Sequence, residues 1–343
     1  MSGLRVAIVG AGKRVLETAL PSLRAAGEPL ALEGIYARSA REVESSGATV
    51  EVRPLDELLA RGLDGVDLVY LAVGKDAVPG VLASLAALRP TRTDLLIETP
   101  VVRFRHFRHA SRVTAFRNAW VAEDCAWLPW FDTLDGAISE GVIDRPRAVW
   151  FDQAAYAYHA VATARRILGG GRVLHGRRRK LSGRFAMRDL RFSGGGTAHI
   201  LEPRDYDSGR IVLMGPKGSV SDFPLTADRN SFLQVLQEED RCTGFRIGDI
   251  RTDLDDSERE LCTRPASGAG VIAIQEDMKR VGFLRIWRSI AGGAGAHRIE
   301  DGLEDMVVDY ALERLGRYRA TPFTSPRGPI GRMTLSLLTR AGG

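Results

Sequence analysis

Two side chains that could stabilise charge follow apolar runs typical of buried strands. Lys75 comes shortly after residues 67–73 ("DLVYLAV"), and Thr99 comes directly after residues 95–98 ("LLIE"). A lysine ammonium can stabilise a developing oxyanion, whereas a threonine hydroxyl offers a neutral hydrogen bond. Because parallel strands end at one edge of a sheet, both residues are candidates for one catalytic crevice.

Tyr156 and His159 form a second candidate catalytic pair. They are three residues apart in a stretch of helical spacing, so they are expected to share a helix face while Tyr158 points elsewhere. A histidine and a tyrosine could supply the general acid for an alcohol or amine product. The alternative interpretation is that both pack in a helix whose polar groups are satisfied by the backbone.

A metal or nucleophile site at Glu123, Asp124 and Cys125 is rejected. No histidine or cysteine stands near them at the spacing of metal ligands, so we expect no metal.

A glycine turn after the first apolar run predicts dinucleotide binding. Residues 4–9 ("LRVAIV") lead into Gly10-Ala11-Gly12, and helical spacing follows in residues 13–26. The first glycine permits a tight turn, and the second lets a pyrophosphate approach backbone amides. A tight turn without a ligand is the alternative. The candidate cofactor-binding residues here are Gly10, Ala11, Gly12, Lys13, Arg14 and Val15.

The end of the second expected strand favours NADP(H) over NAD(H). A site for NAD usually has a carboxylate at this point to bind the ribose hydroxyls. Here Ala37 removes the carboxylate, and Arg38 with Ser39 could hold a 2′-phosphate. An arginine on a solvent-exposed loop is the alternative.

The elements that position these residues alternate between strand and helix in the first part of the chain. Such alternation predicts an α/β Rossmann domain with a doubly wound parallel sheet over residues 1–121. Residues 122–343 are expected to form an α+β domain with a large open, mostly antiparallel sheet. The expected strands are 4–9, 32–37, 50–53, 67–73, 95–98, 148–153, 196–201, 210–214, 219–223 and 270–274, and the expected helices are 13–26, 40–46, 55–60, 78–88, 131–140, 156–168 and 300–315.

Composition indicates a soluble protein of ordinary globular type. The 343 residues are 44% hydrophobic and 27% charged, with three scattered cysteines and no apolar run that could span a bilayer. No signal-peptide pattern is present, so we expect a cytoplasmic protein. The net charge is +5, with basic clusters at residues 103–109 and 177–180. They permit nucleic-acid binding, but no recognised nucleic-acid module surrounds them, and a solvated basic surface is favoured.

Several motifs in order resemble the glucose–fructose oxidoreductase/inositol dehydrogenase (Gfo/Idh/MocA) family. Besides the glycine turn, they are Pro21-Ser22-Leu23, the stretch 56–59 with Val66-Asp67, Glu98-Thr99-Pro100 and the turn 215–218. The resemblance covers most of the chain. It implies a ligand between the two domains and a homodimer or homotetramer formed through the open sheet. It also implies that Ala72, Val73, Gly74, Glu98 and Pro100 lie beside the cofactor.

The departures from this family concern the catalytic residues. The loop 74–78 lacks the family's Asn and His, Thr99 replaces the lysine of its Glu-Lys-Pro motif, and Ala155 replaces the Asp that precedes His159 by four positions. Lys75 is a candidate to supply the missing cation.

These features predict an NADP(H)-dependent oxidoreductase acting on a C=O or C=N carbon of a small molecule. The departures leave open a cofactor-binding protein without net redox turnover, which could be a sensor, a scaffold or a lyase-like enzyme with transient redox.

Overall fold

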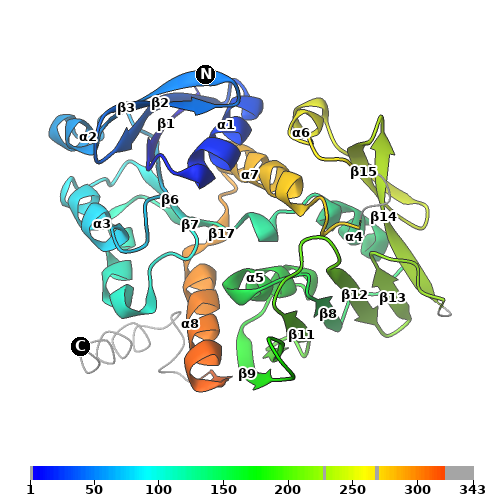
Figure 1. Ribbon diagram of the computed structural model, residues 1–343. Helices are drawn as coiled ribbons and strands as arrows, with labels where there is room; N and C mark the ends of the chain where they lie inside the picture. Colours follow the sequence, from blue (N-terminus) through cyan, green and yellow to red (C-terminus); the bar gives the residue numbers. More distant parts are fainter. Residues whose placement is uncertain (1–2, 227–228, 267–269, 321–343) are drawn as a thin grey trace. The chain divides into compact units, whose positions relative to one another are not determined.

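The computed structural model describes residues 3–226, 229–266 and 270–320 and divides into two compact units (Figure 1). Unit 1 contains the chain up to Asp124 and the later segment Phe283–Met306, and unit 2 contains Cys125–Gly282 and continues from Val307. The return of 283–306 to unit 1 was not predicted from the sequence. The expected domain boundary after residue 121 stays a prediction, and it concerns only the place where the chain first passes from unit 1 to unit 2.

Unit 1 is built on an eight-stranded sheet with strand order β17-β7-β6-β5-β1-β2-β4-β3. The pairs from β7 through β4 are parallel, and only the edge strands β17 and β3 pair antiparallel. The strands are β1 (Leu4–Val9), β2 (Leu30–Ala37), β3 (Arg41–Ser45), β4 (Ala48–Pro54), β5 (Leu68–Leu71), β6 (Asp94–Glu98), β7 (Ala119–Ala122) and β17 (His297–Arg298).

The apolar runs in the sequence form the central strands of this sheet. All residues of β5 and β6 are buried, as are the last four residues of β1, because helices cover parallel sheets on both faces. The helical segments of unit 1 are the π-helix η1 (Val15–Ala19), α1 (Leu20–Ala26), α2 (Leu55–Arg61), α3 (Val78–Ala87) and the 3-10 segment η2 (Phe104–Ala115), with parts of α7 (Gln275–Ala291) and α8 (Ile299–Leu315).

One expected helix is a strand. Residues 40–46 were expected to be helical, but Arg41–Ser45 is β3, which pairs antiparallel with β4. Ser46 has a φ of 51° and Gly47 a φ of 75°, so these two residues form the tight turn of a hairpin. Alternation in "REVES" is therefore the relevant pattern, and the helix prediction was wrong.

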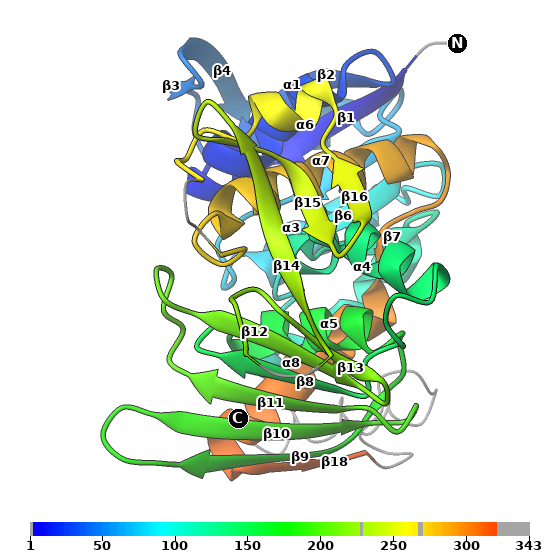
Figure 2. The ribbon, with the colours of Figure 1, turned by 90° about the vertical axis from the view of Figure 1, so that its right-hand side faces the viewer.

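Unit 2 contains a ten-stranded sheet with order β16-β15-β14-β13-β12-β8-β11-β10-β9-β18. Figure 2 shows β9, β10, β11, β8, β12 and β13 lying side by side in this order. Only the pairs β8–β11 and β13–β14 are parallel. The strands are β8 (Ala148–Asp152), β9 (Val173–Lys180), β10 (Ala186–Phe192), β11 (Thr197–Glu202), β12 (Arg210–Gly215), β13 (Gly218–Ser221), β14 (Asn230–Glu238), β15 (Arg241–Ile247), β16 (Ile250–Asp253) and β18 (Arg317–Arg319).

The central strands of this sheet bury one face. In β8, Val149 and Phe151 are buried while Trp150 is half-buried, and in β11 Ala198 and Ile200 are buried while His199 is half-buried. Helix α8 covers part of the buried face, because a Cβ added at Gly176 of β9 would touch Leu312 of α8. The helices of unit 2 are the 3-10 turn η3 (Asp124–Ala126), α4 (Trp130–Ser139), α5 (Ala157–Ile167) and α6 (Asp256–Glu260), with the start of α7 and the end of α8.

The predicted fold class is confirmed: a Rossmann-type parallel sheet and a large, mostly antiparallel sheet. The prediction of a strand at 270–274 was wrong, because these residues form a turn before α7. Within the described residues, no helix combines the length and the apolar character that crossing a membrane requires.

Candidate functional site

The glycine turn after β1 lies at the carboxyl edge of the unit 1 sheet. Gly10 has a φ of +127°, and a Cβ there would lie 2.2 Å from the carbonyl oxygen of Ala72, so only glycine lets the chain pass so close to the end of β5. The Gly10 amide donates to the carbonyl of Tyr36 at the end of β2 (2.7 Å). A Cβ at Gly12 would meet nothing within 4 Å. The turn therefore leaves open space at the start of the helix, where a pyrophosphate would fit.

Three polar side chains, those of Arg38, Ser39 and Arg41, lie near the end of β2. Ala37 is half-buried, whereas Arg38 and Ser39 are exposed. Arg38 makes no ion pair with any described residue of the chain. The hairpin strand β3 adds Arg41, whose guanidinium donates to the carbonyl of Ala11 (3.2 Å). Two arginines, Arg38 and Arg41, thus lie near the end of β2, and Arg41 was missed because its segment was expected to be helical.

Glu98, the last residue of β6, is the centre of a buried hydrogen-bond network. One carboxylate oxygen accepts from Arg14 Nε (3.1 Å) and from the Tyr70 hydroxyl (2.5 Å). The other accepts from both the backbone amide and the hydroxyl of Thr99, each at 3.0 Å. Lys75 Nζ donates to the Glu98 carbonyl oxygen (2.9 Å). The structure therefore brings Lys75, Thr99, Glu98 and Arg14 together, and Thr99 orients the Glu98 carboxylate.

Arg14, predicted above as a cofactor-binding residue, is the second cation of this network beside Lys75. Its Nη2 donates to Asp124 (2.7 Å), so it lies between two carboxylates. Its guanidinium is also 5.1 Å from the ring centroid of Phe283, which in turn contacts Tyr70 edge-to-face. Tyr70 was missed from sequence, because a tyrosine inside an apolar strand has no local signal, and Asp124 was considered only as part of a rejected metal or nucleophile site.

Burial and neighbouring charges set the pKa values here in opposite directions. Burial lowers the pKa of Lys75 from 10.5 to about 8, with Arg14 adding to the effect and Glu98 opposing it. Burial alone would raise the pKa of Glu98, but Arg14, Lys75 and the Tyr70 hydrogen bond outweigh it, so that pKa is lowered. Glu98 is therefore ionised at neutral pH, and Lys75 is a cation that can release its proton near physiological pH.

The other implied cofactor residues lie at the same edge of unit 1. Ala72 and Val73 are half-buried and directly follow β5, and a Cβ at Gly74 would meet nothing within 4 Å. Thr99 is buried, with 8% of its surface exposed, and Pro100 is half-buried after β6.

In unit 2, Tyr156 is not part of a helix as expected. It is the residue before α5, with extended backbone (φ −154°, ψ 158°). Its ring centroid is 5.4 Å from that of His159, whereas the Tyr158 ring is 4.2 Å from His159. The prediction that Tyr158 points elsewhere was wrong, because the rings of Tyr158 and His159 contact each other although the two residues are adjacent on α5.

A cationic and polar group that the sequence analysis missed surrounds Tyr156. Arg204 lies 5.8 Å from the Tyr156 ring and 3.9 Å from the Tyr206 ring, and its Nη2 donates to Gln275 (2.8 Å). Burial raises the pKa of Tyr156, while Lys279 and Arg204 oppose the rise. The tyrosine therefore keeps its proton at neutral pH.

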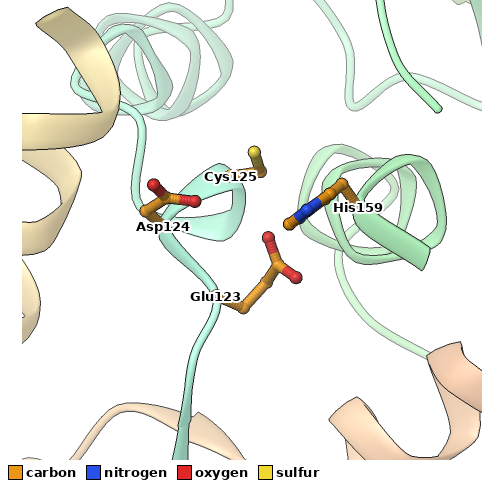
Figure 3. A group of neighbouring side chains, drawn as sticks. All are labelled: Glu123, Asp124, Cys125 and His159. Carbon is orange, nitrogen blue, oxygen red and sulfur yellow. The ribbon is translucent and has the colours of Figure 1, made fainter. Parts of the chain in front are cut away.

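Figure 3 shows Glu123, Asp124 and Cys125 following one another where β7 leads into η3, with His159 on α5. One ligand-type atom from each of the four lies within 4.8 Å of the others. The argument that Cys125 has no histidine partner was therefore wrong. The Thr163 hydroxyl explains the proximity, because it lies within hydrogen-bonding distance of the carbonyls of Cys125 (3.2 Å) and His159 (2.8 Å). Since Asp124 is already ion-paired with Arg14, we assign no metal to this group.

The basic clusters are largely ion-paired within their own units. Arg103 and Arg105 both pair with Asp76 in unit 1, the first at 3.0 Å. In unit 2, Arg179 pairs with Asp189 (3.1 Å), and Arg178 lies 3.3 Å from a carboxylate oxygen of α8. Such pairs use charge that phosphate contacts would need.

No protein-family profile and no curated protein matches the sequence. Solved structures do match over most of the chain. The aldose-aldose oxidoreductase from Caulobacter crescentus is 14% identical, with 93% of this chain and 100% of that chain covered and a TM-score of 0.61. The scyllo-inositol dehydrogenase from Lactobacillus casei is 12% identical, with 93% and 98% covered and a TM-score of 0.61.

The chain shares the fold of these two proteins. A third match is GenD2 from gentamicin A biosynthesis in complex with NAD, 16% identical, with 94% and 97% covered and a TM-score of 0.59. The resemblance drawn from the sequence motifs is thus confirmed for the fold. Identities of 12 to 16% establish a shared fold.

Proposed function

We propose that this protein is an NADP(H)-dependent oxidoreductase that acts on a C=O or C=N carbon of a small molecule. The observation that carries the proposal is the edge of the unit 1 sheet, where an open glycine turn lies beside the half-buried cation Lys75. Gly12 leaves space for a pyrophosphate, and Lys75 lies over the end of β6. The complex of GenD2 with NAD supports a nicotinamide cofactor for this fold.

The residues of unit 1 fit such a cofactor. The open Cβ positions at Gly12 and Gly74 leave room for it, and Arg38 and Arg41 supply positive charge at the end of β2. A nicotinamide bound there would supply hydride transfer. The residues that would hold the cofactor are Gly10, Ala11, Gly12, Lys13, Arg14, Val15, Ala37, Arg38, Ser39, Ala72, Val73, Gly74, Glu98 and Pro100.

Lys75 supplies the positive charge that the lysine at position 99 would supply in the resembled family. Its ammonium polarises the substrate oxygen or nitrogen, and Glu98 holds the ammonium through its carbonyl. Thr99 positions Glu98 and does not contact the substrate itself. His159, with Tyr156 beside its ring, exchanges the proton that the alcohol or amine product requires.

Replacing Arg38 tests the cofactor preference. An arginine–phosphate contact is charge-assisted, so Arg38→Ala should weaken NADPH binding by about 10- to 100-fold and leave NADH binding nearly unchanged. Nicotinamide fluorescence in a titration of the purified protein measures both. Arg92→Ala is the matched control, because Arg92 is exposed at the amino end of β6. Equal losses for the two cofactors would overturn the phosphate assignment.

A second candidate function, cofactor binding without net redox turnover, is favoured by the position of Arg14. Its guanidinium is held between Glu98 and Asp124 at the sheet edge, where it adds a fixed ion pair to the site. Following NADPH absorbance with panels of carbonyl and imine compounds separates the two functions. Tight binding without oxidation of NADPH across the panels would favour the second.

A further inference from the structure

Arg204 of unit 2 is fixed in position by the loop that carries it. This loop, residues 203–209, joins β11 to β12, and Gln153 bonds to it on both sides of Arg204. The Gln153 side chain donates to the Pro203 carbonyl (2.9 Å), and the Gln153 carbonyl accepts from the Asp205 amide (2.8 Å). The main chain on either side of the arginine is therefore anchored.

The Arg204 side chain is oriented as well, but it keeps hydrogen-bonding capacity. Its Nη2 donates to Gln275 Oε1 (2.8 Å), and one face of the guanidinium lies 3.9 Å from the Tyr206 ring centroid. Its Nε is buried and has no hydrogen-bond partner in the described part of the chain. A guanidinium has five N–H donors, so these contacts use only part of what Arg204 offers.

Arg204 forms no ion pair with a carboxylate of the residues that the structure describes, because the acids around it are engaged elsewhere. Asp205 accepts from both amides and the hydroxyl of the turn at 207–208, at 2.7 to 3.1 Å. Glu276 pairs with Lys279 (2.6 Å). The half-buried Arg204 guanidinium therefore keeps a positive charge that no side chain of the described chain neutralises.

Positive charge is in excess around this arginine. Burial alone would raise the pKa of Glu276, but nearby cations outweigh burial and lower that pKa. These cations are Lys279, Arg204 and Arg264. One carboxylate thus lies among three cations, and such an excess favours the binding of an anion.

Arg204 is also a neighbour of the residues proposed to move the proton. Its guanidinium carbon is 5.8 Å from the Tyr156 ring centroid, and the Tyr156 ring centroid is 5.4 Å from that of His159. All three residues belong to unit 2. A small molecule that reacts beside His159 can therefore reach Arg204 with a substituent. A planar guanidinium binds a carboxylate through two parallel, charge-assisted hydrogen bonds.

We propose that Arg204 binds a carboxylate of the substrate, so that the protein acts on oxo acids rather than on neutral carbonyl compounds. This inference rests on the proposed function, because it names the substrate class of that reaction. Reduction of an oxo acid consumes one NADPH and one proton and gives a hydroxy acid and NADP⁺. The hydride goes to the carbonyl carbon and the proton to the carbonyl oxygen, while the carboxylate stays unchanged on Arg204.

The test compares oxo acids with their own methyl esters on the full-length protein. The panel contains 2-oxo, 4-oxo and 5-oxo acids of several chain lengths, with NADPH and NADH supplied in parallel. Cofactor absorbance gives kcat/KM, and isothermal titration calorimetry gives the affinity. At least one acid should exceed its ester by about 10- to 100-fold in both quantities. Esters that equal every acid, or acids that neither bind nor react, would overturn the proposal.

Substitutions then identify Arg204 as the group that binds the carboxylate. Arg204→Gln should raise KM for the preferred acid by about 10- to 100-fold, change kcat little and leave the esters unaffected. Arg204→Lys should keep part of the preference. Arg184→Gln is the matched control, because Arg184 is an exposed arginine of unit 2 that also lies near an aromatic ring, 5.7 Å from that of Phe185. Equal losses for acids and esters in Arg204→Gln would show a structural role and overturn the assignment.

The outcomes separate this inference from the proposed function. Oxidation of NADPH by neutral carbonyl compounds alone would retain the oxidoreductase and overturn the carboxylate site. Acids whose binding Arg204→Gln weakens, without any oxidation of NADPH or NADH, would support the carboxylate site and overturn the reduction. The comparison of acids with esters is made on wild type, so it does not depend on the folding of a variant.

Discussion

At the scale of single residues, Thr99 offers no charge where the motif of the resembled family has a lysine, and the Lys75 ammonium lies at the same edge of the sheet. Thr99 was correctly singled out as lacking a cation, and its hydroxyl is bonded to Glu98. Lys75 was correctly placed near the end of β6, because neighbouring parallel strands end at one edge. Arg14 could not be placed this way, because its contact with Asp124 joins residues 110 positions apart in the sequence.

Lys75 should give the reaction a specific pH dependence. Its pKa, lowered from 10.5 to about 8, means that the ammonium is present below about pH 8 and is lost as the pH rises through that value. The rate of substrate reduction should therefore fall above about pH 8, following one deprotonation. Steady-state kcat/KM between about pH 6 and about pH 10 measures it.

Two substitutions identify Lys75 as the group that titrates. Lys75→Met should lower kcat/KM by about 100-fold at neutral pH. Lys75→Arg should retain part of the activity and move the alkaline fall to higher pH, because arginine stays charged. An unchanged alkaline limb in Lys75→Arg would mean that another group causes it.

At the scale of elements, prediction from sequence succeeded where a strand is buried on both faces. β1, β5 and β6 appear as continuous apolar runs, and runs of only four to six residues are shorter than a typical helix. It failed at β3, β14 and β15, where polar and apolar residues mix because the strands are partly exposed. Whether such segments form strands depends on pairing partners that are distant in the sequence, and a local pattern does not reveal those partners.

The buried hydrogen bond between Asp222, after β13, and Ile211 of β12 should make the free energy of unfolding depend on pH. Asp222, directly after β13, is buried and accepts from the Ile211 amide of β12 (2.8 Å), while its other oxygen has no hydrogen-bond partner among the described residues. Burial raises its pKa from 3.8 to about 6. The folded state therefore holds this proton more tightly than the unfolded state does. The resulting stability is fully present below about pH 4 and is lost as the pH rises through about 6.

The difference between wild type and Asp222→Asn isolates this group. Wild type should lose up to about 3 kcal/mol of unfolding free energy relative to the variant between about pH 4 and about pH 7, because a shift of one pKa unit corresponds to about 1.4 kcal/mol. Urea unfolding at a series of pH values measures it. Asp64→Asn, at an exposed position, is the matched control. Parallel pH curves for wild type and Asp222→Asn would refute the assignment.

At the scale of the whole molecule, sequence patterns predicted two sheets but not how the chain is shared between the units. α7 begins in unit 2 and ends in unit 1, and α8 does the reverse. In unit 1, Trp287 of α7 donates to the Ala19 carbonyl (3.1 Å), a contact that spans 268 positions. The sequence predicted a helix at 300–315, where α8 lies, but residues 302–308 are all buried, so its pattern does not identify the sheet against which each half packs.

The half-buried face of the unit 2 sheet should be an interface between copies of this chain. Trp150 of β8 stacks on His199 of β11 (centroids 5.5 Å apart, planes at 29°), and His199 Nδ1 contacts Asp189 of β10 (2.8 Å). Arg179 of β9 pairs with the same carboxylate. A large aromatic ring among fixed polar groups is typical of interface composition, and a sheet face can pair with itself about a two-fold axis.

We therefore expect a homodimer or homotetramer that Trp150→Glu dissociates to monomers, because a charge placed at the centre of such a face must be desolvated without a partner. Size-exclusion chromatography with light scattering gives the mass directly, and circular dichroism checks that the variant is folded. Leu32→Glu introduces the same charge at an exposed apolar residue of unit 1, on β2, and should leave the mass unchanged. If Trp150→Glu keeps the wild-type mass, the face is not the interface. If Leu32→Glu alone dissociates the protein, the interface lies on unit 1.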